Sequence, residues 1–194
     1  MKNNQNGRSM VEMLGVLAII GVLSAGGLAG YSKAMFKHKL NSTMEQVTML
    51  VTNIRTAWGT QGNYNDLTEA RAVSLGAVPA VMGSAGSLTN PFKGSVKIAA
   101  AKAKSTAADG TAFTVLYAGL PAEACIALAT ADFGSGAGSG FIGVDAAATA
   151  KDDLPSTAVI GDGAGTRAEG KAYAMSDAIT ACSGTTNSVI WKFY

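Results

Sequence analysis

The 194-residue chain is short of charge, histidine and proline. Only 14% of its residues are charged and the formal net charge is +2, so the composition gives no argument for a nucleic-acid partner. The single histidine, His38, has no serine, cysteine or aspartate near it in a recognisable nucleophile arrangement, which argues against a histidine-based active site. No proline precedes Pro79, so a helix in the first 78 residues would not be broken by proline. We expect neither an enzyme nor a cofactor-binding protein.

Other candidate sites for ligands are weak. The glycine-rich stretches 134–140 and 161–165 carry neither the lysine of a P-loop nor a strand-to-helix context, so we expect surface loops there. Asp152, Asp153 and Asp162 could supply oxygen ligands to calcium, but their spacing fits no EF-hand. The sequence therefore predicts no metal site and no catalytic residue.

What the chain does have is a long apolar run, from Met13 to Tyr31, that follows a short polar leader ending at Gly7. At a helical rise of ~1.5 Å per residue the run spans about 28 Å, close to the hydrocarbon thickness of a bilayer. A conventional secretory signal has its cleavage site after the apolar region. A cut after Gly7 would leave the apolar helix on the mature protein. We therefore expect this helix to have a function in the mature protein.

A single carboxylate, Glu12, lies at the start of this run. A charge in a membrane helix is costly, and it usually marks a pairing or functional site. Gly21 and Ala25, and likewise Gly26 and Gly30, are small residues four positions apart, a spacing that lets helices approach closely in apolar surroundings. The pattern favours a helix that packs against other helices, although a plain anchor with an incidental glutamate stays open.

The stretch from Gly7 to Leu23 resembles the class III signal of a type IV prepilin, in which a membrane peptidase cuts after the glycine and methylates the new N-terminus. The resemblance implies cleavage between Gly7 and Arg8, N-methylation of Arg8, and an assembly role for Glu12, the fifth mature residue. Arg8 departs from the family pattern, because the first mature residue is usually hydrophobic, such as phenylalanine or methionine.

Beyond the anchor, apolar residues recur at steps of three and four, which is typical of one face of an amphipathic helix: Phe36, Leu40, Met44, Val47, Val51, Ile54 and Trp58. We expect the charged residues around this face to stay solvated: Lys33, Lys37, Lys39, Glu45 and Arg55. Because Gly59 and Gly62 supply the stop, the sequence predicts one helix of about 50 residues from Ser9 to Trp58. Its part from Val47 onward is expected to pack on its own domain, with packing against neighbouring copies as the alternative.

The remaining residues, about 135, suffice for one compact domain. In chain order the sequence predicts a short helix capped by Asn65-Asp66 and ended by Gly76, a turn at 90–92, strands at 96–99 and 112–118, a helix from Pro121 to about Thr130, and a strand at 188–194. The stretches 133–143 and 160–170 are expected as glycine-rich loops. The predicted fold is α+β, with a long protruding N-terminal helix packed on a globular head with an antiparallel sheet.

Both cysteines, Cys125 and Cys182, lie in this head. In an exported domain such a pair suggests one disulfide, which would close a loop of about 58 residues and contribute on the order of 4 kcal/mol, and two free buried thiols are the alternative. The segments 120–125 and 181–194 resemble the type IVb pilin subgroup, whose disulfide-bounded region and C-terminal strand frame the exposed face.

These resemblances imply a structural subunit of a type IVb pilus, an extracellular filament used in adhesion, aggregation or conjugation-type contact. Residues 1–7 would be a cleaved leader, 8–60 a helix that first spans the membrane and then forms the filament core, and 61–194 the head. The implied partners are further copies of the chain, the prepilin peptidase, and the assembly machinery of the inner membrane. The precursor would sit in that membrane with its head in the periplasm.

Two other functions stay open. A minor pilin or a type II secretion pseudopilin would share the N-terminus, but pseudopilins usually lack the large disulfide-bounded region that Cys125 and Cys182 suggest. A membrane-tethered binding protein is the alternative of a different class, and it would stay monomeric with Gly7 uncut.

Overall fold

A computed structural model describes residues 6–134, 139–148, 160 and 173–194, with side chains from Met10 onward. The chain forms two compact units, Met1–Lys39 and Leu40–Tyr194. Helix α1, Asn6–Trp58, belongs to the first unit up to Lys39 and to the second from Leu40. Its 53 residues confirm the single long helix that the absence of proline predicted. Gly62, at φ +67°, adopts a left-handed conformation just beyond the helix end.

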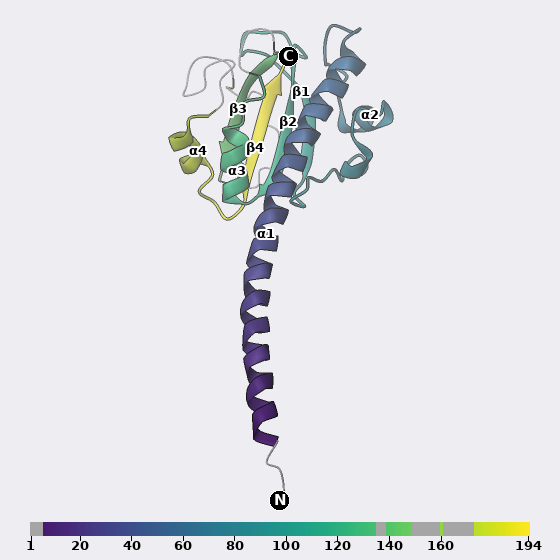
Figure 1. The fold of residues 1–194 in the computed structure, drawn as a ribbon. Coiled ribbons are helices and arrows are strands. Elements are labelled where there is room, and N and C mark those ends of the chain that lie inside the picture. The colour runs from purple at the N-terminus through teal and green to yellow at the C-terminus, as the bar shows by residue number, and fades with distance from the viewer. Residues whose placement is uncertain (1–5, 135–138, 149–159, 161–172) are drawn as a thin grey trace, which may run out of the picture. The chain divides into compact units, whose positions relative to one another are not determined.

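The second unit is built on a four-stranded antiparallel sheet (Figure 1). Its strands are β1, Val96–Ala101; β2, Ala112–Leu120; β3, Phe141–Ala147; and β4, Asn187–Phe193. The order in the sheet is β1-β2-β4-β3, so the last strand of the chain is inserted at the centre. Trp191 of β4 is paired with Val115 on one side and with Val144 on the other. The fold is therefore α+β with a long N-terminal helix, as predicted.

The end of α1 packs on one face of this sheet. Val47, Leu50, Ile54 and Trp58 are all buried in the same core cluster as Trp191, and none is more than 2% exposed. This confirms that the apolar stripe packs on its own domain. Aromatic rings fill the sheet side of the core: Tyr117 meets Trp191 edge to face at 5.5 Å, and Phe113 stacks on Phe193 at 5.7 Å.

Short helices complete the described part of the unit, and two of them were predicted: α2, Glu69–Ser74, and α3, Ala122–Ala129. Helix α2 begins later than expected because Thr68, and not Asn65-Asp66, is its N-cap: the Thr68 hydroxyl accepts a hydrogen bond from the Arg71 amide. Gly76, at φ +70°, follows its end. Helix α3 starts after Pro121 and ends at Ala129, with Thr130 as its C-cap, in agreement with the predicted end at about Thr130. The predicted turn at 90–92 is present, with Asn90 Oδ1 accepting from the amides of Phe92 and Gly94.

Three elements in the described part of the chain were not predicted. Strand β3 begins inside the stretch expected as a glycine-rich loop, and its pairing with β4 buries Phe141, Ile142 and Val144. Helix α4, Met175–Ala181, has no side-chain cap. A single-turn 3-10 helix, η1, spans Ala80–Met82. The loop predicted at 160–170 lies outside the described residues apart from Ile160.

Candidate functional site

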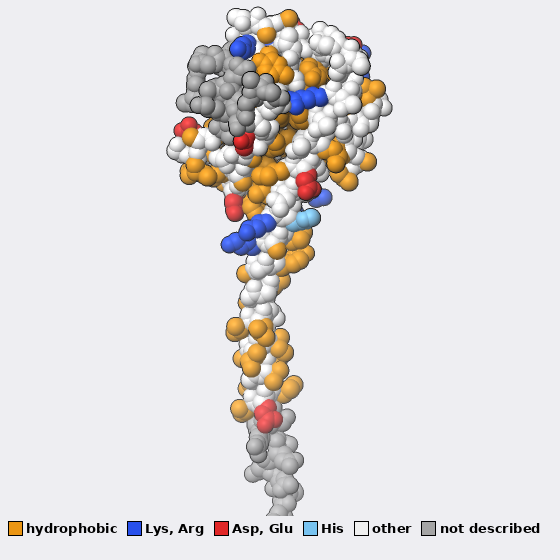
Figure 2. Space-filling model, turned by 45° about the horizontal axis from the view of Figure 1, so that its top comes forward, with side chains coloured by type: hydrophobic (Ala, Val, Ile, Leu, Met, Phe, Trp, Pro, Cys, Tyr) orange, Lys and Arg blue, Asp and Glu red, His pale blue; other side chains and the backbone are white. Residues whose placement is uncertain are grey.

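The N-terminal unit presents a continuous apolar helical surface. Its large hydrophobic side chains between Met10 and Tyr31 are 52–74% exposed (Figure 2). The 18-residue window that marks a candidate span in this helix has a mean hydropathy of 2.1 and is 0% buried, and its length and composition suit a membrane crossing. A core helix of a soluble protein would be covered by its own domain. This surface needs either lipid or another protein around it.

The residues predicted as sites lie on this helix, but the structure does not assign them roles. Gly7 and Arg8 fall in the helical backbone, and their side chains lie outside the described part. A Cβ added at Gly21, Gly26 or Gly30 would meet no atom within 4 Å. Nothing in the described chain therefore requires glycine at these positions. Ala25 and Glu12 lie on the same exposed stretch of the helix.

The predicted disulfide joins two helices of the head. Cys125 of α3 and Cys182, which caps the end of α4, form an S–S bond with 5.8 Å between their Cα atoms. Both residues are at most 1% exposed, so the bond lies in the core. The loop that it closes contains strand β3 and helix α4, which the sequence analysis did not predict. The crosslink thus joins the two ends of this region.

Arg55 ties the end of α1 to two distant segments. Its Nε donates to the carbonyl of Tyr194 at 2.9 Å and its Nη1 to the carbonyl of Ser139 at 2.9 Å. The guanidinium also lies 5.5 Å from the centre of the Phe193 ring, within range of a cation–π contact. Burial lowers the pKa of Arg55, and the nearby Tyr64 phenol opposes that shift. The prediction that Arg55 stays solvated was wrong.

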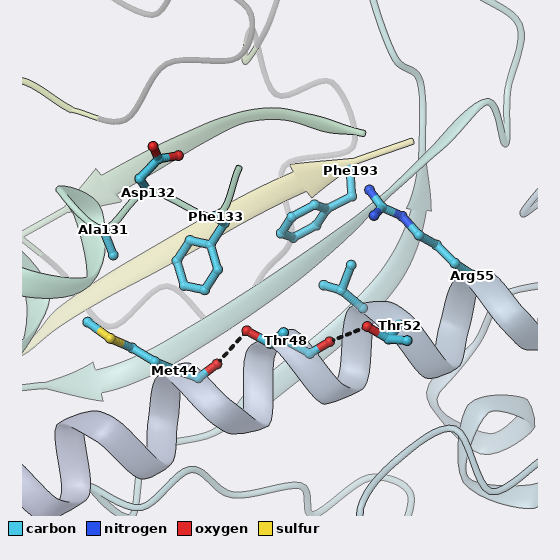
Figure 3. A pocket seen from close by; sticks show the side chains of 9 residues that line it. Met44, Thr48, Thr52, Arg55, Ala131, Asp132, Phe133 and Phe193 are labelled. Atoms are coloured by element: carbon cyan, nitrogen blue, oxygen red, sulfur yellow. Dashed lines mark hydrogen bonds between the residues drawn. The ribbon is translucent and has the colours of Figure 1, made fainter. Parts of the chain in front are cut away.

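A groove opens beside Arg55 between α1 and the segment that follows α3. Its volume is about 350 Å³, and Figure 3 shows Met44, Thr48, Thr52 and Arg55 on the α1 side. Phe133 and Phe193 lie on the opposite side of the groove. Among the described residues the Arg55 Nη2 has no hydrogen-bond partner. The sequence could not reveal this groove, because its lining comes from three separate parts of the chain.

No group of three or more histidine, cysteine, aspartate or glutamate side chains that could hold a metal occurs within the described residues. Asp152, Asp153 and Asp162, considered above for calcium, lie outside the described part, as does the 161–165 stretch. Of the stretch 134–140, residues 135–138 are likewise not described. His38 lies on α1. The described geometry suits packing and crosslinking.

The family model described as PilS N terminal matches residues 37–193, which is most of the chain. The chain belongs to this family. The major structural subunits of the bundle-forming pilus of Escherichia coli O111:H- and of E. coli O127:H6 (strain E2348/69) are each 26% identical to this pilin over 194 residues. Each comparison covers 98% of the pilin and 95% of the relative. The resemblance to type IV pilins of the type IVb subgroup is confirmed.

The fold of the pilin is also found in a crystal structure of TcpA, a type IV pilin from the El Tor biotype of Vibrio cholerae. The two structures align with a TM-score of 0.52 and 20% sequence identity. The alignment covers 81% of this pilin and 99% of TcpA. At this identity the likeness concerns the fold alone, and it agrees with a long N-terminal helix and an antiparallel sheet.

Proposed function

We propose that the chain is the structural subunit of a type IVb pilus and polymerises through its N-terminal helix into an extracellular filament. The observation that carries the proposal is the exposed apolar surface of α1 between Met10 and Tyr31 in a chain of this family. Before assembly, the inner membrane would cover this surface, with the head in the periplasm. In the filament, the same surface of neighbouring copies would cover it.

Processing of the precursor is the first step in this proposal. The prepilin peptidase would cut after Gly7 and methylate the amino group of Arg8, and the inner-membrane assembly machinery would then extract the mature chain. Removing residues 1–7 places a positively charged amino terminus four residues before Glu12. The Arg8 side chain adds a second positive charge at the same end.

Glu12 would set the register between copies. In an apolar bundle, an unpaired carboxylate is strongly destabilising, so it selects the position at which it meets a cation. The amino terminus of a neighbouring copy provides that cation. Such a contact joins two different surfaces, and its repetition generates an open helical polymer rather than a closed ring. Gly21, Ala25, Gly26 and Gly30 would let the helices approach closely in the bundle.

The proposal assigns the chain a structural role without catalysis or a cofactor. Electron microscopy of filaments sheared from cells, combined with mass spectrometry of their subunit, tests it. The expected result is filaments made of this chain with Arg8 as the first residue. Recovery of the chain only as a membrane-bound monomer with residues 1–7 retained would contradict the proposal and favour a tethered binding protein.

A further inference from the structure

Glu45 is an acidic side chain on α1 that has no counter-ion among the described residues. It is exposed, and no ion pair involving it occurs in the described part of the structure. Side chains three or four residues away are the ones that a helical carboxylate can reach, and those around Glu45 are all uncharged: Asn41, Ser42, Thr48 and Met49. A cationic partner for the Glu45 carboxylate would therefore come from outside its own helix.

Lys33 and Lys37 show the opposite imbalance. Both are exposed, and neither has an ion pair among the described residues. They lie four residues apart on α1, where two like charges destabilise a helix. An anion supplied from outside the chain would relieve this repulsion. Lys39 differs from them, because it is half-buried and already interacts within its own chain.

The face of α1 that carries Glu45 can pack against another protein surface. Glu45 lies on an open face of α1 to which Met44 and Met49 also contribute. The threonine hydroxyls beside it donate within the helix: Thr48 to the Met44 carbonyl at 2.9 Å and Thr52 to the Thr48 carbonyl at 2.8 Å. Because these donors are already satisfied, another surface can exclude water here without leaving them unpaired.

We propose that Glu45 of one copy pairs with Lys37 of a second copy of this chain. The inference rests on the proposed polymerisation and names a second contact that sets the same register. In both pairs the cation precedes the anion along α1, by four residues for Arg8 and Glu12 and by eight for Lys37 and Glu45. Helical residues rise ~1.5 Å each, so four residues correspond to about 6 Å along the helix axis and eight residues to about 12 Å. Parallel copies displaced along that axis by a distance in this range bring both pairs together. The flexible lysine stem accommodates the difference.

Charge reversal tests the pair in cells that express the full-length chain. Glu45→Lys and Lys37→Glu should each lower the yield of sheared filaments by at least about tenfold, because like charges then face each other across the contact. The double variant restores opposite charges and should return the yield to near that of the unmodified chain. Filaments of the unmodified chain, counted in the same experiment, test the proposed function separately.

Two matched variants make the result specific. Glu123→Lys places the same charge change on an exposed residue of α3 and should leave the yield unchanged. Lys33→Glu combined with Glu45→Lys should not restore assembly, because the twelve-residue offset of about 18 Å exceeds the proposed displacement. If Lys37 instead binds anionic lipid headgroups, the double variant with Lys37→Glu stays deficient, and that outcome overturns the proposal.

Crosslinking provides a direct measurement. Filaments whose subunits carry both Lys37→Cys and Glu45→Cys, treated with a short bis-maleimide reagent, should give a ladder of covalent dimers and higher multimers on denaturing gels. Subunits with either cysteine alone should stay monomeric, because each residue faces a different one on the neighbour. The absence of a ladder from assembled double-cysteine filaments would show that the two positions do not meet.

Discussion

Arg55 Nε and the Tyr194 carbonyl are joined by a hydrogen bond of 2.9 Å, although 139 residues separate them in the chain. A second bond from the same guanidinium reaches Ser139, just before β3. The end of α1 is thus held to the residue that follows β4 and to the segment that precedes β3. Two charge-assisted bonds at one side chain make Arg55 a strong anchor of the helix on the head.

The first prediction concerns this anchor. Arg55→Met keeps much of the aliphatic packing but removes both hydrogen bonds, and should lower the free energy of unfolding of the head by about 1–3 kcal/mol. Urea unfolding of the detergent-solubilised chain measures this change in the free energy of unfolding. Arg71→Met is the control, because the Arg71 pair with Asp66 is well exposed and its loss should cost less than about 1 kcal/mol. Equal effects of the two changes would contradict the anchoring role.

The second prediction concerns Tyr117, whose hydroxyl is buried without a hydrogen-bond partner among the described residues. Burial raises the pKa of Tyr117 well above its usual range. The neutral phenol is therefore favoured in the folded state, and the stability that it contributes is complete below about pH 10 and lost as the pH rises further. Tyr117→Phe should weaken this alkaline loss and should be neutral or stabilising at pH 7, because it removes an unpaired polar group. Unfolding titrations of both chains across this pH range provide the measurement.

Cleavage of the leader gives the third prediction. Gly7→Val should leave an uncut precursor in the inner membrane and abolish filaments, because the proposed peptidase site lies directly after Gly7. Mass spectrometry of the membrane-held chain should find Met1 at its start, whereas the unmodified mature chain should begin at Arg8. Filaments built from subunits that still begin at Met1 would refute this prediction.

The fourth prediction concerns the disulfide between Cys125 and Cys182. Cys182→Ser should destabilise the head by roughly 2–5 kcal/mol and lower the amount of pilin in the periplasm, since the unfolded chain is no longer constrained by the closed loop. Immunoblots of periplasmic and membrane fractions and unfolding titrations provide the measurement. Alkylation of both thiols in denatured, unreduced filaments of the unmodified chain would show that the bond is absent.

The fifth prediction separates membrane insertion from assembly. Glu12→Val removes a costly charge from the membrane helix, so insertion should be unharmed or improved, while the proposed pairing with a neighbouring amino terminus is lost. The chain should accumulate as processed, membrane-held subunit beginning at Arg8, with few or no filaments. Abundant filaments of normal helical symmetry from the Glu12→Val strain would leave Glu12 without the proposed register role.

Local sequence signals were sufficient where one segment carried the whole pattern. The spacing from Leu40 to Trp58 predicted α1 and its buried face, and the strand predicted at 112–118 is present as β2. They were insufficient for β3, which begins in a glycine-rich stretch expected as a loop, and for α4, which lacks a capping side chain. The leader, Glu12 and the small residues of the N-terminal helix remain predictions, because their proposed partners are a peptidase or other copies.

The sequence by itself determined the long helix, its apolar exposed part and the cysteine pair, because helical periodicity, hydropathy and cysteine count are properties of short stretches or of composition. Only the tertiary structure decided that the C-terminal strand lies at the centre of the sheet, that Arg55 is partly buried, and that Thr68 caps α2. Each of these depends on which distant segment supplies hydrogen bonds or covers a side chain. That choice follows from packing of the whole domain, and no local pattern encodes it.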